Sequence, residues 1–177
     1  VINGTHPLNY STDSDELKDG DEIGTLASGI YSNPSENDTD GDGLTDDIEY
    51  GLNRSAYVEW VGSAWSTTQT NAKKYDSDDD TLSDYVEVTA EGNATVTVTR
   101  LTAEGVVEVV NYVTEITNPM VADTDGDGLN DDKEIAGEDQ NGVATGFGVT
   151  DPNVADTDNY ELSDYEEINQ VFRDSNT

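Results

Sequence analysis

The sequence contains no cysteine, one histidine, one methionine and only seven basic residues against forty acidic ones. Without cysteine, the chain forms neither disulfides nor zinc–thiolate sites. The single histidine, His6, stands where a turn former is expected, so Ser–His–Asp chemistry has no well-placed member. The motifs GxSxG, HExxH and a phosphate-binding glycine loop are missing too. We therefore expect no enzymatic activity and no catalytic residue.

The formal net charge of −33 excludes several classes of partner. Such a charge repels nucleic acid phosphates and anionic membrane surfaces. The longest apolar stretches are strand-sized, so we expect no direct membrane insertion. A calcium sensor is also disfavoured, because sensors expose a methionine-rich groove and this chain has only Met120.

Most of the acidic residues belong to five copies of a twelve-residue loop. Each copy holds six acidic residues, which places 30 of the 40 acidic residues in 60 of the 177 positions. Position 7 of the loop is always Leu, position 9 always Asp and position 12 always Glu. The five loops are Ser11–Glu22, Asp38–Glu49, Asp76–Glu87, Asp123–Glu134 and Asp156–Glu167.

A proline or alanine stands four residues before position 1 of each loop. All four prolines of the chain occupy this place, and loop 3 has Ala72 instead. Just before it comes a residue that we call the leader residue, usually a turn former: His6, Asn33, Asn71, Asn118 and Asp151. A proline here also discourages a helix from entering the loop, which argues against a helix–loop–helix lever.

The loop pattern is that of a calcium site. Loops 2 and 4 match DxDxDG, five residues and Glu, in which carboxylates at positions 1, 3, 5 and 12 and the carbonyl at position 7 surround one ion. Position 9 acts directly or through water, and the glycine at position 6 permits a sharp turn. The expected metal ligands are Asp38, Asp40, Asp42, Leu44, Asp46 and Glu49 in loop 2; Asp123, Asp125, Asp127, Leu129, Asp131 and Glu134 in loop 4; Asp76, Asp78, Asp80, Leu82, Asp84 and Glu87 in loop 3; Ser11, Asp13, Asp15, Leu17, Asp19 and Glu22 in loop 1; and Asp156, Asp158, Leu162, Asp164 and Glu167 in loop 5.

Three loops depart from the pattern, and one alternative applies to all five. Loop 3 has Thr81 at position 6, which predicts a strained site; loop 1 begins with Ser11; loop 5 has Tyr160 in place of the third carboxylate. Degenerate loops could keep Leu and Glu for packing alone. The alternative is that DxxE at positions 9 to 12 is a helix capping box, with acids favoured by the helix dipole.

The recurring [ND]P-x3-DxDxDGLxDxxE pattern resembles the thrombospondin type 3 repeat, in the cysteine-free form of bacterial and archaeal surface proteins. The resemblance covers the loops and their leaders, roughly half of the chain. It implies a calcium-stabilised, extended, extracellular architecture, often a stalk or spacer. Dockerins have related loops but use a tandem pair, so they are less similar.

The inserts between the loops are strand-like. Residues 95–114 alternate Val and Thr around a turn and predict a β-hairpin. Tyr57, Trp60 and Trp65 suggest a second hairpin, and residues 142–149 a fifth short strand. The predicted fold class is therefore α+β and partly irregular: an elongated array of five EF-hand-like loops with short exit helices and an inserted small antiparallel β-sheet. Residues 1–55 would carry loops 1 and 2, residues 56–122 the hairpins around loop 3, and residues 123–177 loops 4 and 5.

Together these features predict an extracellular or cell-surface structural protein that binds three to five Ca²⁺ ions. It would be a rigid stalk or the subunit of a filament, because a chain that begins and ends within the repeat phase could join head to tail or enter a larger surface assembly. An adhesion module that grips a glycan or protein through Trp60 and Trp65 is the alternative. Possible glycosylation sequons occur at Asn3, Asn9, Asn37, Asn53 and Asn93. Salt adaptation could also contribute acidic residues.

Overall fold

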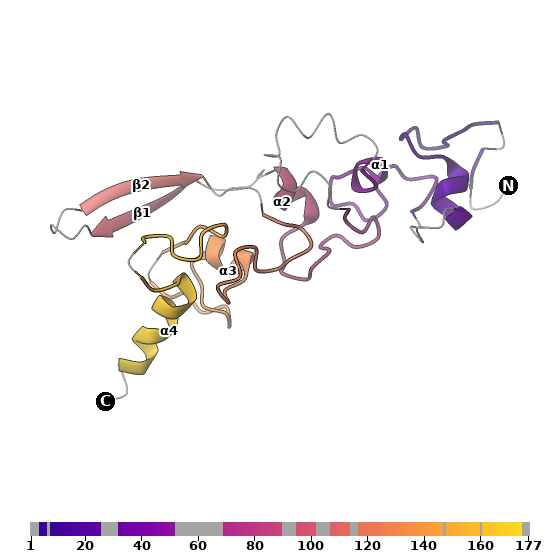
Figure 1. Ribbon diagram of the computed structural model, residues 1–177. Helices are drawn as coiled ribbons and strands as arrows, with labels where there is room; N and C mark the ends of the chain where they lie inside the picture. The colour runs from indigo at the N-terminus through magenta and orange to yellow at the C-terminus, as the bar shows by residue number, and fades with distance from the viewer. Residues whose placement is uncertain are drawn as a thin grey trace. The chain divides into compact units, whose positions relative to one another are not determined.

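A computed structural model describes residues 4–6, 8–25, 32–51, 69–89, 95–101, 107–113, 117–146, 148–159 and 161–174. The chain divides into two compact units, Val1–Thr89 and Ala90–Thr177. The first unit contains the π-helical turn η1 (Asp21–Thr25) and helices α1 (Asp46–Glu49) and α2 (Asp84–Thr89). The second contains strands β1 (Thr95–Leu101) and β2 (Val107–Val113) and helices α3 (Asp131–Ala136) and α4 (Asp164–Asp174) (Figure 1).

All four α-helices begin at position 9 of a loop, so the short exit helices expected after loops 2 to 5 are present. The acidic residues of the first turn interact favourably with the helix dipole. Helix α3 ends at Gly137, whose φ of 68° is left-handed. A Cβ atom at Gly137 would lie 2.7 Å from the carbonyl oxygen of Gly148, so only glycine fits this end of the helix.

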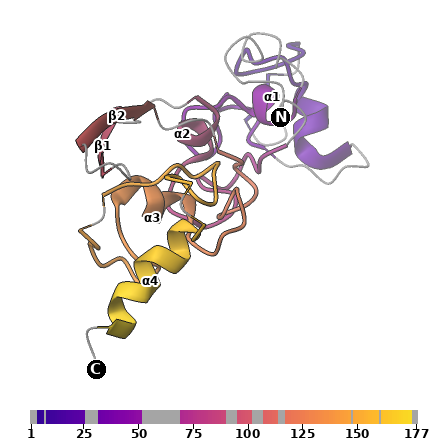
Figure 2. The same cartoon turned by 60° about the vertical axis from the view of Figure 1, so that its left-hand side comes forward.

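The predicted α+β class with an inserted antiparallel sheet is wrong for the part of the chain that the structure describes. These residues form five short helical segments joined by irregular loops, and their only strands are the two of one hairpin. That hairpin was expected: β1 pairs antiparallel with β2 from Thr95 opposite Val113 to Leu101 opposite Val107, and Figures 1 and 2 show the two strands side by side. No further strand joins it among the described residues.

The other predicted strands have separate outcomes. Residues 142–149 do not form a strand where they are described: the chain bends at Gly142 and Gly146, and Ala144 makes only an isolated bridge to Glu138. The hairpin predicted around Trp60 and Trp65 lies outside the described residues. Periodicity identified the Val/Thr repeat correctly, but it could not tell a short glycine-rich loop from a strand.

The interior of the described residues contains few apolar side chains and many carboxylates. Position-7 leucines fill it, with Leu17 and Leu44 each 2% exposed and Leu129 0% exposed. Leu17, Tyr50 and Ala72 form one apolar cluster in the first unit. Twelve buried side chains are loop acids at positions 5, 9, 10 or 12, among them Asp46, Asp84, Asp131, Glu22, Glu49, Glu87 and Glu134. The small amount of buried apolar surface does not offset the free-energy cost of burying these carboxylates in their charged form.

Within the described residues, no helix combines the length and apolar content needed to cross a membrane. Asn9 and Asn37 are exposed, whereas Asn3, Asn53 and Asn93 lie outside the described residues.

Candidate metal centres in the acidic loops

One hydrogen-bond network closes every loop. In loop 2 the N–H of Asp46 donates to the carbonyl of Asn37 at 2.9 Å. The Asp46 carboxylate accepts bonds from the N–H and the hydroxyl of Thr39, at 2.9 and 2.8 Å. The N–H of the leader residue Asn33 donates to the same hydroxyl at 2.7 Å. The hydroxyl at position 2 thus links the leader residue to position 9.

The same network recurs in the other four loops. It joins Asp19 to Thr12, Asp84 to Ser77, Asp131 to Thr124 and Asp164 to Thr157. In each case the N–H of the leader residue donates to the position-2 hydroxyl. Position 9 was expected to act on the metal; in the structure its carboxylate first of all closes its own loop.

Position 2 is a functional position that the metal-ligand pattern does not single out, although the sequence carries a signal for it. The residue there is Ser or Thr in all five loops: Thr12, Thr39, Ser77, Thr124 and Thr157. The metal-ligand pattern gives position 2 no role, because only the odd positions of the DxD run supply carboxylates. A hydroxyl is required because the group must donate to a carboxylate and accept from an N–H at once.

The aspartate at position 1 shapes the first half of the loop. In loop 2 the two oxygens of Asp38 accept the N–H groups of Gly41 and Gly43, at 2.8 and 3.1 Å. Both glycines have left-handed φ, 79° and 111°. Loops 3 and 4 repeat these bonds with Asp76 and Asp123.

The strain predicted for loop 3 is present. Thr81 occupies position 6 with a φ of 91°, a conformation that a β-branched residue adopts only under constraint. Its N–H still donates to Asp76 at 2.8 Å, so the loop keeps its shape and the strain is carried by the threonine backbone.

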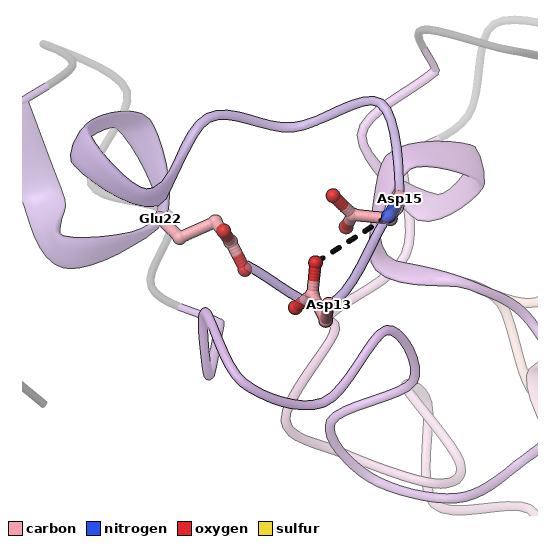
Figure 3. A group of neighbouring side chains, drawn as sticks. All are labelled: Asp13, Asp15 and Glu22. Carbon is pink, nitrogen blue, oxygen red and sulfur yellow. Dashed lines mark hydrogen bonds between the residues drawn. The ribbon is translucent and has the colours of Figure 1, made fainter. Parts of the chain in front are cut away.

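Carboxylates gather within ligand range of a single point in four of the loops. In loops 2, 3 and 4 one oxygen from each of positions 1, 3 and 5 lies within 4.8 Å of the other two. In loop 1 the group consists of Asp13, Asp15 and Glu22, with Glu22 carried by η1 and facing the two aspartates (Figure 3). These clusters can hold a metal ion.

Several oxygens in these clusters are buried without any hydrogen-bond partner. They include Oε2 of the position-12 residues Glu22, Glu49 and Glu134, whose side chains are 0%, 1% and 1% exposed. At position 3 they include Oδ2 of Asp13, Asp40, Asp78 and Asp125. Buried polar atoms normally find a partner, because an unsatisfied one is costly. An ion is the partner that suits several such carboxylates at once.

Burial strongly favours the protonated form of these acids when no ion is bound. It raises the pKa of Glu22 to about 8, of Glu49 to about 9 and of Glu134 to about 10. The second cause that raises these pKa values is the negative charge of neighbouring loop acids: Asp13 beside Glu22, Asp40 beside Glu49 and Asp125 beside Glu134. In loop 1 the position-12 glutamate also faces position 3 of its own loop (Figure 3).

The capping alternative does not account for these acids. Helices α1 and α3 have Thr45 and Asn130 as N-cap residues, and neither side chain makes a capping hydrogen bond. Asp46 and Asp131 turn their carboxylates back to position 2, and one oxygen each of Glu49 and Glu134 is buried without a partner. The acids at positions 9 and 12 are thus committed to the loop interior.

Loop 5 has a weaker arrangement. Its closing network is intact and Glu161 at position 6 has a φ of 82°, but its described residues present no group of three converging carboxylates. Glu167 is only half-buried; burial and the charge of Asp158 raise its pKa. Tyr160 lies outside the described residues.

No known protein family, curated protein or solved structure matches the chain. The resemblance to the thrombospondin type 3 repeat therefore rests on the loop pattern alone.

Proposed function

We propose that this chain is a calcium-binding structural module whose fold is completed by ions in its acidic loops, and that its role is mechanical rather than catalytic. The observation that carries the proposal is the buried, unpartnered Oε2 at position 12, seen in Glu22, Glu49 and Glu134. Together with the unpartnered oxygens at position 3, these atoms form a set of hard oxygen ligands that no positively charged side chain neutralises in the described contacts. A protein that leaves such groups inside its core needs a cation to fold stably.

Calcium fits the ligand set better than magnesium. The loops offer only oxygen ligands, in numbers sufficient for the six to eight that calcium takes. Magnesium demands near-ideal octahedral geometry and keeps several waters, which suits a crowded loop poorly. Zinc prefers nitrogen and sulfur ligands, and the chain has one histidine and no cysteine. We expect three to five ions to bind; five would bring ten positive charges against the formal net charge of −33.

The calcium affinity that such a module needs indicates the compartment in which it works. Ions that bind only the folded chain stabilise it by mass action, so sites with Kd on the order of 10⁻⁴ to 10⁻³ M suffice where calcium is millimolar. Calcium at that concentration is extracellular. We therefore assign the module to a cell surface or the extracellular space, as a stalk or spacer or as the subunit of a filament.

Thermal unfolding tests the proposal. The ion-free protein is titrated with calcium while its melting temperature and the ion stoichiometry are measured, with magnesium at equal ionic strength as control. We expect the melting temperature to rise with three to five calcium ions bound and to respond little to magnesium.

Two variants sharpen the experiment. Glu49→Gln removes a buried carboxylate of loop 2 and is expected to lower the stoichiometry by one ion. Glu36→Gln changes an exposed acid outside the loops and is expected to bind like the unaltered protein. A stable ion-free protein with no calcium response would refute the proposal, and equal effects of the two variants would attribute the response to net charge.

A further inference from the structure

The position-12 glutamates of loops 1, 2 and 4 are tied to the segment that begins the next repeat. In loop 2 the hydroxyl of Thr70 donates to Oε1 of Glu49 at 3.0 Å, across 21 residues of chain. In loop 4 Thr150 donates to Oε1 of Glu134 at 2.9 Å. In loop 1 Ser32 donates to Oε1 of Glu22 at 3.0 Å. All three donors stand immediately before a leader residue, a place that is Ser or Thr throughout the sequence.

The hydrogen bond from each hydroxyl to Oε1 restricts the position of the second oxygen, Oε2, of the same glutamate. A glutamate side chain has several rotatable bonds, and burial alone does not fix the plane of its carboxylate. With Oε1 held by a hydroxyl, Oε2 is fixed in the buried interior, where it has no other partner. The bond therefore pre-organises the glutamate as a ligand, because it occupies only Oε1 and leaves Oε2 available to the ion.

A second contact from the next repeat reaches position 5 in two loops. The N–H of Tyr85, in α2, donates to Oδ2 of Asp42 at 2.8 Å. The N–H of Tyr165, in α4, donates to Oδ2 of Asp127 at 2.7 Å. Each tyrosine ring also covers the position-6 glycine of the earlier loop: a Cβ atom on Gly43 would lie 3.1 Å from the ring of Tyr85.

We propose that the ion sites of loops 1, 2 and 4 are each completed by the repeat that follows, and that Thr70 and Thr150 are positioning residues for the ions of loops 2 and 4. The inference rests on the proposed function, since it concerns the same ions. In each case the loop depends on a later part of the chain: loop 2 on residues 69–71 and on α2, and loop 4 on residues 148–151 and on α4.

Site-resolved calcium titrations test the proposal. The amide NMR signals of Gly43 and Gly128 report loops 2 and 4 separately, because each glycine belongs to one loop. In Thr70→Val, which removes the hydroxyl and keeps the shape, calcium affinity at Gly43 should fall 10- to 100-fold while affinity at Gly128 stays unchanged. Thr150→Val should give the reverse pattern.

Serine variants separate positioning from packing. Thr70→Ser and Thr150→Ser keep the donor and lose a methyl group, so they should restore affinity to within about threefold of the unaltered protein. Thr145→Val is the matched control, because the hydroxyl of Thr145 donates to a backbone carbonyl, that of Gly137. It should leave both titrations unchanged.

The outcomes distinguish the two proposals. If the unaltered protein shows no calcium response at Gly43 and Gly128, the proposed function fails. If it responds and neither valine variant weakens its own loop, the completion of sites by the next repeat is wrong. Equal losses in the valine and serine variants would also overturn it, since packing would then be the cause. Should one valine variant fail to fold, the other still decides.

Discussion

Calcium binding should release protons, and the number follows from the buried glutamates. Burial raises the pKa of Glu22, Glu49 and Glu134 to about 8, 9 and 10, so at pH 7 all three are mainly protonated when no ion is bound. An ion requires the ionised form, so each of these glutamates gives up its proton when its loop is filled. We expect at least three protons to leave per molecule when loops 1, 2 and 4 fill at pH 7, because Asp15 and Asp125, whose pKa values burial raises to about 7, add part of a proton each.

The direction of the pH dependence differs between the ion-free and the ion-bound protein. In the ion-free protein these glutamates have raised pKa values, so their contribution to stability is fully present below the ordinary value of 4.5 and is lost as pH rises towards 8 to 10. Calcium competes with the same protons, so its affinity rises across that window. The gain in melting temperature on adding calcium should therefore grow between about pH 5 and pH 9.

Isothermal titration calorimetry in buffers of different ionisation enthalpy measures the released protons directly. The observed binding enthalpy, plotted against the buffer's ionisation enthalpy, has a slope equal to the number of protons exchanged. Repeating the titration at pH 10.5, where these glutamates are largely ionised, should reduce the slope. A slope near zero at pH 7 would show that the glutamates are already ionised without calcium and would refute the reasoning from burial.

Three substitutions test the scaffold and its strain by chemical denaturation of the calcium-loaded protein. Thr39→Val removes the hydroxyl that bonds the buried Asp46 and should cost about 1.5–3 kcal/mol, whereas Thr39→Ser should cost little; equal losses would contradict the hydrogen-bond account. Thr81→Gly relieves the φ of 91° and should stabilise loop 3 by about 1 kcal/mol after the entropy of glycine is allowed for, so a loss of stability would argue against strain. Gly128→Ala should destabilise by about 1–2 kcal/mol, because its φ is 107° and the new Cβ would lie 3.4 Å from the ring of Tyr165. Gly126→Ala has a φ of 79° and no atom within 4 Å of the new Cβ, so it should cost less; the opposite order would show that the ring contact is unimportant.

The parts of the structure that follow from short-range pattern were predictable from the sequence. Loop boundaries, the start of each exit helix at position 9, the strain at Thr81 and the β1–β2 hairpin all depend on residues close together in the chain. The convergence of positions 1, 3 and 5 is likewise local, because it is set by the turn that Gly41 and Gly43 allow.

The parts that depend on contacts between repeats were not predictable in the same way. Nothing within loop 2 indicates that Thr70 bonds Glu49 or that the N–H of Tyr85 bonds Asp42, because both partners come from the next repeat. The prediction of a sheet with further strands was wrong for a related reason. Strand propensity marks a segment as suited to pairing, but whether a further strand joins it depends on tertiary packing.

The closing network has a consequence for how such a chain can change over generations. The hydroxyl at position 2 and the aspartate at position 9 hold every loop in shape, including loop 5, where Tyr160 replaces a carboxylate at position 5. The position-2 hydroxyl shapes the loop without belonging to the converging carboxylates, whereas the position-1 aspartate of loops 2, 3 and 4 does both. A repeat can lose ligands by mutation without losing its form, and can regain them by single substitutions. Under the proposed function, such a chain would adjust the calcium concentration that it needs one loop at a time, while its length and register stay constant.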